Sequence, residues 1–342
     1  MTGAPVHPKP PTSDPQPSPP VPGAVPAPPT GIGVGVGRRI LRAVAIAATV
    51  PYLVLKSAWL GGSHLGIPDG SVLLGPGLFF PLMNALSLVM DSGVVLLALV
   101  LTRPRGLRVP AWLLTVPVFI ATGLLTPIIL GFPGQLLTAA LGASPDAAER
   151  AAREPFLDPW VFNVVYLGFM IQAVALAGLF VPYARQRWGR LWQGRLGERL
   201  PPSTGVVAGA AAVMALTVSA AYGYWAFGGT AGQNPAQIAR YSSDSGVVSV
   251  VHAICALTAG VGSVWLARGG SRRARGPLAV AWIGSSATLS WGVWLSVALL
   301  GTGSGPGERP TAATLLLYAA QMITGLLATT VLTRFLASRR AA

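Results

Sequence analysis

The feature that most constrains this chain is a series of long stretches without a charged residue. A bilayer core about 30 Å thick is crossed by roughly 20 residues of helix, and six uncharged stretches reach that length. They are residues 109–145, 159–184, 205–239, 245–267, 276–307 and 310–333. Two earlier apolar stretches are each interrupted by one ionisable side chain, Lys56 or Asp91. The pattern predicts an all-α fold, a polytopic helical membrane bundle with eight transmembrane helices.

The predicted spans can be placed approximately along the chain. They are about 42–60, 80–102, 111–130, 160–183, 206–227, 246–267, 279–300 and 311–333. The composition supports a membrane protein, because 52% of the residues are hydrophobic and only 10% are charged, whereas soluble domains carry about 25% charged residues. The net charge of +14 falls in the connecting segments rather than on a soluble surface. We therefore expect no nucleic-acid partner.

Basic residues are distributed unequally between alternate connecting segments. With the amino terminus inside, nineteen basic residues fall on the inner side and four on the outer side. Because positive residues near spans favour the cytoplasmic side, both termini are predicted to be cytoplasmic, in a multi-pass protein of the bacterial inner membrane. The arginine-rich inner segments are expected to attract the anionic lipids of the inner leaflet.

The amino-terminal region differs in composition from the rest of the chain. The first 30 residues contain twelve prolines, and residues 31–37 alternate glycine with apolar residues. Such a segment buries too little apolar surface to offset its ordering entropy. We predict that residues 1–37 form a disordered cytoplasmic tail and that residues 38–342 form the transmembrane domain. Proline-rich segments are bound by other proteins, so the tail offers a site for a protein partner.

Two fully charged side chains, Lys56 and Asp91, lie within predicted spans. A charge in hydrocarbon costs about 2.5–3.5 kcal/mol on insertion scales, so such groups usually pair or face water. At 1.5 Å per residue, Lys56 lies about 21 Å from Arg42 and Asp91 about 18 Å from Arg103. Similar heights on successive helices predict a Lys56–Asp91 pair. A structural ion pair is favoured, and the alternatives are a functional pair or an unpaired Lys56 that extends to the membrane boundary.

Four uncharged polar side chains lie at a similar predicted height in later spans. They are Gln172, Ser286, Ser290 and Gln321. Together with Lys56 and Asp91 they form a candidate intramembrane polar site, as a substrate site at the membrane midplane would require. Hydrogen bonding between helices in lipid produces the same pattern without a substrate, and it is the favoured interpretation.

Residues suited to catalysis or metal binding are few. His252 is the one histidine within a predicted span, and the single cysteine, Cys255, excludes a disulfide framework and a cysteine-rich metal site. The sequence contains no zinc-protease, phosphate-loop or serine-hydrolase motif. We therefore assign no catalytic residue, metal ligand or cofactor site.

Residues 51–62 read Pro-Tyr-Leu-Val-Leu-Lys-Ser-Ala-Trp-Leu-Gly-Gly. This segment resembles the Pro-Tyr…Lys-x-x-Trp…Gly segment of uncharacterised multi-pass membrane proteins from actinobacteria, in which it occurs early in an all-helical bundle. The hydropathy profile is also similar. The resemblance implies an integral membrane protein and implies no activity or site residues.

The sequence predicts an integral membrane protein and does not specify its activity; the favoured type is transporter-like, with Lys56 and Asp91 as a polar pair at the membrane midplane. One alternative is a non-catalytic membrane scaffold or accessory protein that recruits a partner through its proline-rich tail. Another is a lipid-modifying membrane enzyme, for which the candidate catalytic side chains are Asp69, Asp91, His252 and Ser286.

Overall fold

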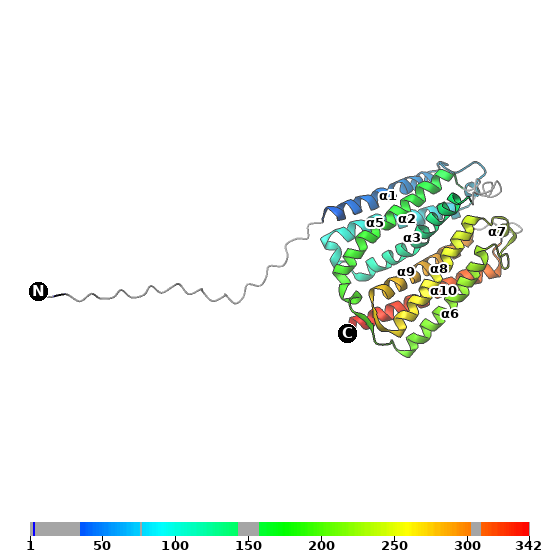
Figure 1. The fold of residues 1–342 in the computed structure, drawn as a ribbon. Coiled ribbons are helices and arrows are strands. Elements are labelled where there is room, and N and C mark those ends of the chain that lie inside the picture. Colours follow the sequence, from blue (N-terminus) through cyan, green and yellow to red (C-terminus); the bar gives the residue numbers. More distant parts are fainter. Residues whose placement is uncertain (1–2, 4–34, 76, 143–156, 302–308, 342) are drawn as a thin grey trace. The chain divides into compact units, whose positions relative to one another are not determined.

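The computed structural model describes residues 3, 35–75, 77–142, 157–301 and 309–341. This part of the chain contains eight helices long and apolar enough to cross a membrane (Figure 1), which confirms the predicted all-α polytopic bundle. They are α1 (Val36–Leu60), α2 (Phe79–Thr102), α3 (Ala111–Ala140), α5 (Pro159–Trp192), α6 (Pro202–Ala226), α8 (Ser243–Arg268), α9 (Arg275–Ala298) and α10 (Ala312–Ala341). Most of the proline-rich tail lies outside the described residues, and α1 begins at Val36, one residue before the predicted end of the tail.

Two helices continue well beyond the predicted spans. Helix α3 ends at Ala140 rather than near residue 130, and α5 ends at Trp192 rather than near residue 183. Bilayer thickness sets the length of the apolar part of a helix, but the helix can extend beyond the hydrocarbon core. Helix α5 therefore continues through the arginine-containing segment and carries a single non-helical residue, Trp188, with φ −127° and ψ 20°.

The eight helices fall into two sets of four that are consecutive in sequence, with α3 at the boundary between them (Figure 1). We call α1, α2, α3 and α5 the first half and α6, α8, α9 and α10 the second half. The core of the first half includes Leu97, Leu114 and Leu179, and that of the second half includes Leu266 and Phe335. Helix α3 packs against α8 and α9, so the two halves meet along this helix.

Close approach of backbones holds the second half together. A Cβ at Gly284 of α9 would lie 2.3 Å from the amide nitrogen of Ala259 on α8, and one at Gly325 of α10 would lie 2.4 Å from that of Leu289 on α9. Small residues allow this approach, which maximises van der Waals contact between helices in lipid. The second half is therefore packed too tightly at these crossings to accept even one methyl group.

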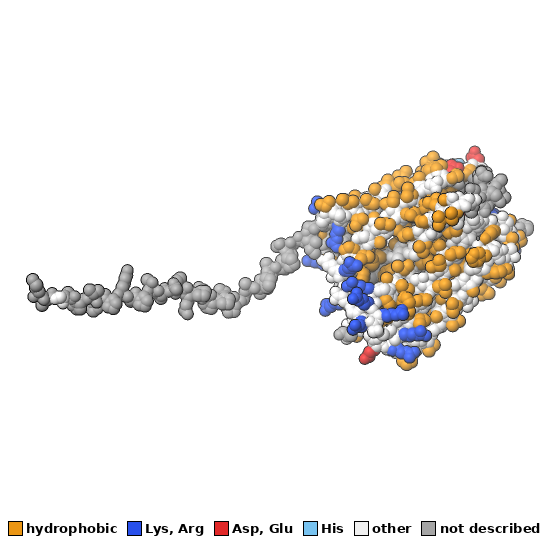
Figure 2. Space-filling model, viewed as in Figure 1, with side chains coloured by type: hydrophobic (Ala, Val, Ile, Leu, Met, Phe, Trp, Pro, Cys, Tyr) orange, Lys and Arg blue, Asp and Glu red, His pale blue; other side chains and the backbone are white. Residues whose placement is uncertain are grey.

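One end of the bundle carries most of the arginine side chains (Figure 2). Helix α1 begins and α10 ends there (Figure 1), and the connectors after α2, α5 and α8 lie there too. We call it the arginine-rich end. The connector after α2 is a short 3-10 helix, η2 (Pro104–Arg108), and two side chains of α5 bind it. Tyr183 Oη donates to the Gly106 carbonyl at 2.8 Å, and Arg187 donates to the Val109 carbonyl at 2.5 Å.

A small antiparallel sheet joins two connectors that are distant in sequence. Strand β1 (Arg195–Gly197) follows α5 and pairs with β2 (Gly270–Arg273), which lies between α8 and α9. Arg339 of α10 donates to the Gln193 carbonyl at 2.8 Å, and Leu196 lies in the core of the second half. The segment that links the two halves is therefore fixed to the second half.

The contacts of Arg187 lead to a first prediction. Arg187→Met is expected to lower the free energy of unfolding by about 1.5–3 kcal/mol, because it removes hydrogen bonds from a charged donor to Tyr183 and to η2. Chemical unfolding in detergent micelles measures the change. Arg185→Met is the matched control, since Arg185 is exposed on the same helix. Equal stability of the two variants would show that these hydrogen bonds contribute nothing.

Candidate functional site

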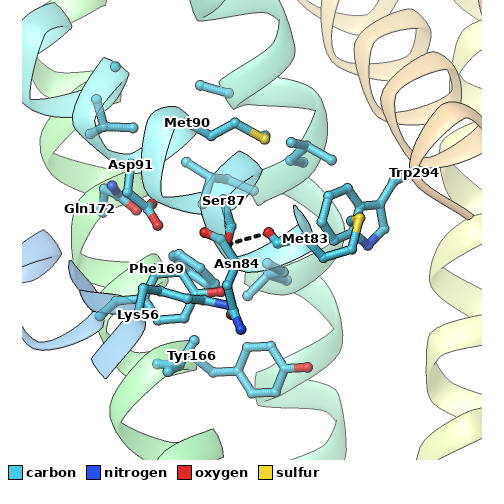
Figure 3. A pocket seen from close by; sticks show the side chains of 18 of the residues that line it. Lys56, Met83, Asn84, Ser87, Met90, Asp91, Tyr166, Phe169, Gln172 and Trp294 are labelled. Atoms are coloured by element: carbon cyan, nitrogen blue, oxygen red, sulfur yellow. Dashed lines mark hydrogen bonds between the residues drawn. The ribbon is translucent and has the colours of Figure 1, made fainter. Parts of the chain in front are cut away.

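A cavity, cavity 1, lies between α1, α2, α3, α5 and α9 and has a volume of about 650 Å³. Its walls are mostly apolar and aromatic, and Trp291 and Trp294 of α9 close the side nearest the second half. The ionisable and amide side chains come from α1, α2 and α5, as Figure 3 shows. Cavity 1 is therefore an apolar chamber with a polar wall inside the first half.

Lys56 of α1 supplies a charge on this wall. Its ammonium donates to Asn84 Oδ1 of α2 at 2.7 Å. The same nitrogen lies 4.8 Å from the ring centroid of Tyr52 and 5.2 Å from that of Trp59, within the range of cation–π attraction. An ammonium has three N–H donors, so one is used by Asn84 and the charge is further stabilised by the two rings.

Asp91 lines the same cavity but does not bind Lys56 directly, because no nitrogen–oxygen distance between them is within 4.0 Å. Asn84 and Asp91 share one face of α2 but are two turns apart, about 10 Å along the axis. The direct Lys56–Asp91 ion pair favoured from the sequence is thus replaced by a Lys56–Asn84 hydrogen bond. The sequence predicted similar depths in the membrane for Lys56 and Asp91, but depth does not show which way each side chain points from its helix.

Three buried polar atoms on this wall have no hydrogen-bond partner among the described residues. They are Asn84 Nδ2, Asp91 Oδ2 and Gln172 Nε2. The three side chains are 1%, 7% and 2% exposed, and the Gln172 amide lies beside the Asp91 carboxylate in Figure 3. Buried polar groups in folded proteins are nearly always hydrogen-bonded. The Gln172 amide and the Asp91 carboxylate face one another, so Asn84 Nδ2 is the donor on this wall that is left for a bound molecule or for water.

The remaining predicted site residues lie elsewhere. Ser286 and Ser290 lie where α9 crosses Gly123 of α3, and Ser286 Oγ donates to a carbonyl of its own helix. Gln321 lies inside the second half, where it accepts a 2.5 Å hydrogen bond from Tyr222 and lies 3.5 Å from His252 Nδ1. The six candidates thus divide into three groups, and Lys56, Asp91 and Gln172 share cavity 1.

Sequence reasoning missed Asn84, the direct partner of Lys56. A signal was present, because Asn84 lies in an apolar segment seven residues before Asp91 and therefore on the same helical face. The aromatic residues Tyr52 and Trp59 precede and follow Lys56 by one helical turn, a spacing that places them on the same face.

A second cavity, cavity 2, has a volume of about 410 Å³ and is lined by α2, α3, α5, α9 and α10. On α2, α5 and α9 its lining residues are closer to the arginine-rich end than those of cavity 1. Helix α3 contributes to both cavities. Three side chains line both cavities: Leu97, Ala121 and Leu125. A thin apolar partition therefore separates cavity 1 from cavity 2.

The described residues contain no group of three or more histidine, cysteine, aspartate or glutamate side chains that could hold a metal ion. The fold and the apolar helix surfaces define a multi-pass integral membrane protein with a polar-walled internal cavity. In comparisons with protein-family models, curated proteins and solved structures, no match to this chain was found.

Proposed function

We propose that this protein transports a small organic solute across the membrane by way of cavities 1 and 2. The observation that supports this most directly is the shared lining at Leu97, Ala121 and Leu125. Cavity 1 extends towards the end opposite the arginine-rich end, and cavity 2 extends towards the arginine-rich end. A shift of a few side chains would connect them, so that a solute could pass from one cavity to the other.

The chemistry of cavity 1 indicates the class of solute. Its apolar and aromatic walls favour an apolar body, while a few polar groups fix the orientation, as in most small-molecule sites. Lys56 and Asn84 offer N–H donors to acceptors on the solute, and Asp91 offers an acceptor to a donor. We therefore expect an amphipathic solute that carries both an acceptor group and a donor group.

Helix α3 is the element best suited to move. It forms part of the partition and contains three internal prolines, at positions 117, 127 and 133. Each proline removes a backbone hydrogen bond from the helix and favours bending. Bending of α3 would displace Ala121 and Leu125 together and so open the partition.

We further propose that the arginine-rich end faces the cytoplasm and that the membrane is a bacterial inner membrane. The support is the concentration of arginine at one end of the bundle (Figure 2), which matches the usual bias of cytoplasmic segments. Cavity 2 is then the inward-facing chamber, and cavity 1 is the outward-facing one.

Cysteine accessibility tests both transport and orientation. Single cysteines replace Ser87 in cavity 1, Thr115 in cavity 2 and Ala121 in the partition, in a Cys255→Ala background that has no other cysteine. A small, charged, membrane-impermeant thiosulfonate is applied to right-side-out and inverted vesicles. We expect modification of Ser87→Cys from outside, of Thr115→Cys from the cytoplasm and of Ala121→Cys from both sides.

Leu216→Cys is the control, because Leu216 is 61% exposed on the lipid-facing surface of α6 and should not react. Leu97→Trp fills the partition and is expected to abolish modification of Ala121→Cys from one side. If Ala121→Cys without the Leu97→Trp substitution were modified from one side only, the transport proposal would be contradicted. Reaction of Thr115→Cys only from outside would reverse the proposed orientation.

A further inference from the structure

Cavity 2 combines an apolar interior with a basic mouth. Arg275, at the start of α9, and Arg340, near the end of α10, both line it. Both side chains are exposed, and neither guanidinium has a hydrogen-bond or ion-pair partner in the described part of the chain. Among the residues that the structure describes, no acidic side chain lines the cavity. Two free positive charges therefore stand at the entrance of a groove that is otherwise almost entirely apolar.

The cavity is also accessible from the side. Its lining includes Val181 of α5 and Ala279 and Ile283 of α9, all of which are exposed on the outer surface of the bundle. The membrane-spanning helices are apolar, as the face seen in Figure 2 illustrates, so their exposed side chains face lipid tails. A hydrocarbon chain can thus enter from the membrane without crossing water.

Aromatic rings line the part of the cavity near its basic mouth. Phe180 and Trp282 stack with their ring centroids 6.1 Å apart, and Trp188 and Trp192 of α5 line the same region. Tryptophan is enriched where membrane proteins meet lipid headgroups. From its interior to its mouth, cavity 2 is lined first by apolar side chains, then by aromatic rings and finally by arginine. A phospholipid has the matching order of acyl chain, glycerol region and phosphate.

We propose that cavity 2 binds an anionic phospholipid, with one acyl chain between the two halves and the phosphate at Arg275 and Arg340. Arginine matches phosphate geometry with paired hydrogen bonds. The amino terminus of α9 begins at Arg275, and its positive dipole end adds to the attraction. A soluble anion would leave the apolar groove unused, and in a zwitterionic lipid the choline cation offsets the phosphate charge that attracts the two guanidiniums.

The lipid site stands independently of the proposed transport function, because it rests on cavity 2 alone. If transport also occurs, the bound acyl chain occupies the chamber next to the partition. The lipid would then compete with the solute for this side of the pathway. If Ala121→Cys reacted from one side only, the transport proposal would be contradicted and the lipid site would be unaffected. If phosphatidylglycerol did not bind, the lipid site would be contradicted and the reaction of Ala121→Cys from both sides would still be expected.

Native mass spectrometry of the full chain, delipidated in mild detergent, tests this site. The probes are dioleoyl phosphatidylglycerol and dioleoyl phosphatidylcholine, which share the same tails. We expect phosphatidylglycerol to bind more tightly. Arg275→Gln/Arg340→Gln is expected to weaken phosphatidylglycerol binding by about thirtyfold, with a much smaller change for phosphatidylcholine, since each basic residue facing an anionic lipid contributes about fivefold.

Two further variants separate a specific site from general attraction. Arg105→Gln/Arg108→Gln removes the same charge from exposed arginines of η2 that do not line cavity 2. Because solvent and salt screen these charges from a phosphate bound in cavity 2, the variant should change binding by less than about threefold. Ala279→Trp fills the groove and should displace the bound lipid while the arginines remain. Equal losses from the two arginine pairs would overturn the site, and so would unchanged phosphatidylglycerol binding to Ala279→Trp.

Discussion

Gly284→Ala is expected to lower the free energy of unfolding by about 3 kcal/mol or more and to deplete the folded protein in membranes. The new methyl carbon would lie 2.3 Å from the backbone nitrogen of Ala259 and 2.6 Å from the carbonyl carbon of Thr258. These are backbone atoms of α8, so no side-chain rotation relieves the overlap. Helices α8 and α9 must separate, and van der Waals contact along the whole crossing is lost. Unfolding in mixed micelles, followed by tryptophan fluorescence, measures the loss.

Gly209→Ala provides the comparison for this effect. Gly209 lies in α6 of the same half, and a Cβ there has no neighbouring atom within 4 Å. Alanine is the better helix former by about 1 kcal/mol, so this variant should be unchanged or slightly more stable. If Gly284→Ala were as stable as Gly209→Ala, the close α8–α9 crossing would be wrong.

Asn84→Leu is expected to lower the free energy of unfolding by about 1.5–3 kcal/mol, because it removes the oxygen that accepts from the Lys56 ammonium. Lys56→Met should have a similar effect, since it leaves Asn84 Oδ1 buried without its donor. The double variant replaces both partners with apolar groups and should be more stable than the sum of the single effects predicts. We expect a coupling energy of about 1.5–3 kcal/mol from the complete cycle.

Ser87 allows the specificity of this coupling to be checked. Its side chain is on the same face of α2 and lines cavity 1, but its hydroxyl donates to the carbonyls of Met83 and Asn84. A cycle of Lys56→Met with Ser87→Ala should give a coupling energy below about 0.5 kcal/mol. Coupling of Lys56 to Ser87 as strong as that to Asn84 would contradict the hydrogen bond as its source.

The helical bundle was predictable from sequence because the bilayer imposes a length and a polarity on each span. Uncharged stretches such as residues 205–239 and 310–333 therefore located α6 and α10. The ends of α3 and α5 were less predictable, because a helix that has left the hydrocarbon can continue without an apolar sequence. The β1–β2 sheet joins connectors about 75 residues apart, and short arginine-rich strands carry no hydrophobic alternation that would reveal such a pairing.

The candidate site was predictable only in part, because sequence position gives the depth of a residue but not its lateral position. Lys56, Asp91 and Gln172 were expected at one level and do line one cavity. Gln321 was expected at the same level, yet it lies in the other half, where Tyr222 and His252 surround it. Which helices become neighbours depends on close packing at residues such as Gly123 and Gly284, which are not distinguished in sequence from other glycines.

The small sheet between the connectors has a mechanical consequence. The backbone passes once between the halves, and the passage after Trp192 is clamped to the second half by β2 and Arg339. Trp188, with its non-helical φ and ψ, is the last point of bending before the clamp. A rotation of the first half relative to the second half would therefore change the backbone dihedral angles at Trp188. The part of α5 before Trp188 would then move with the first half.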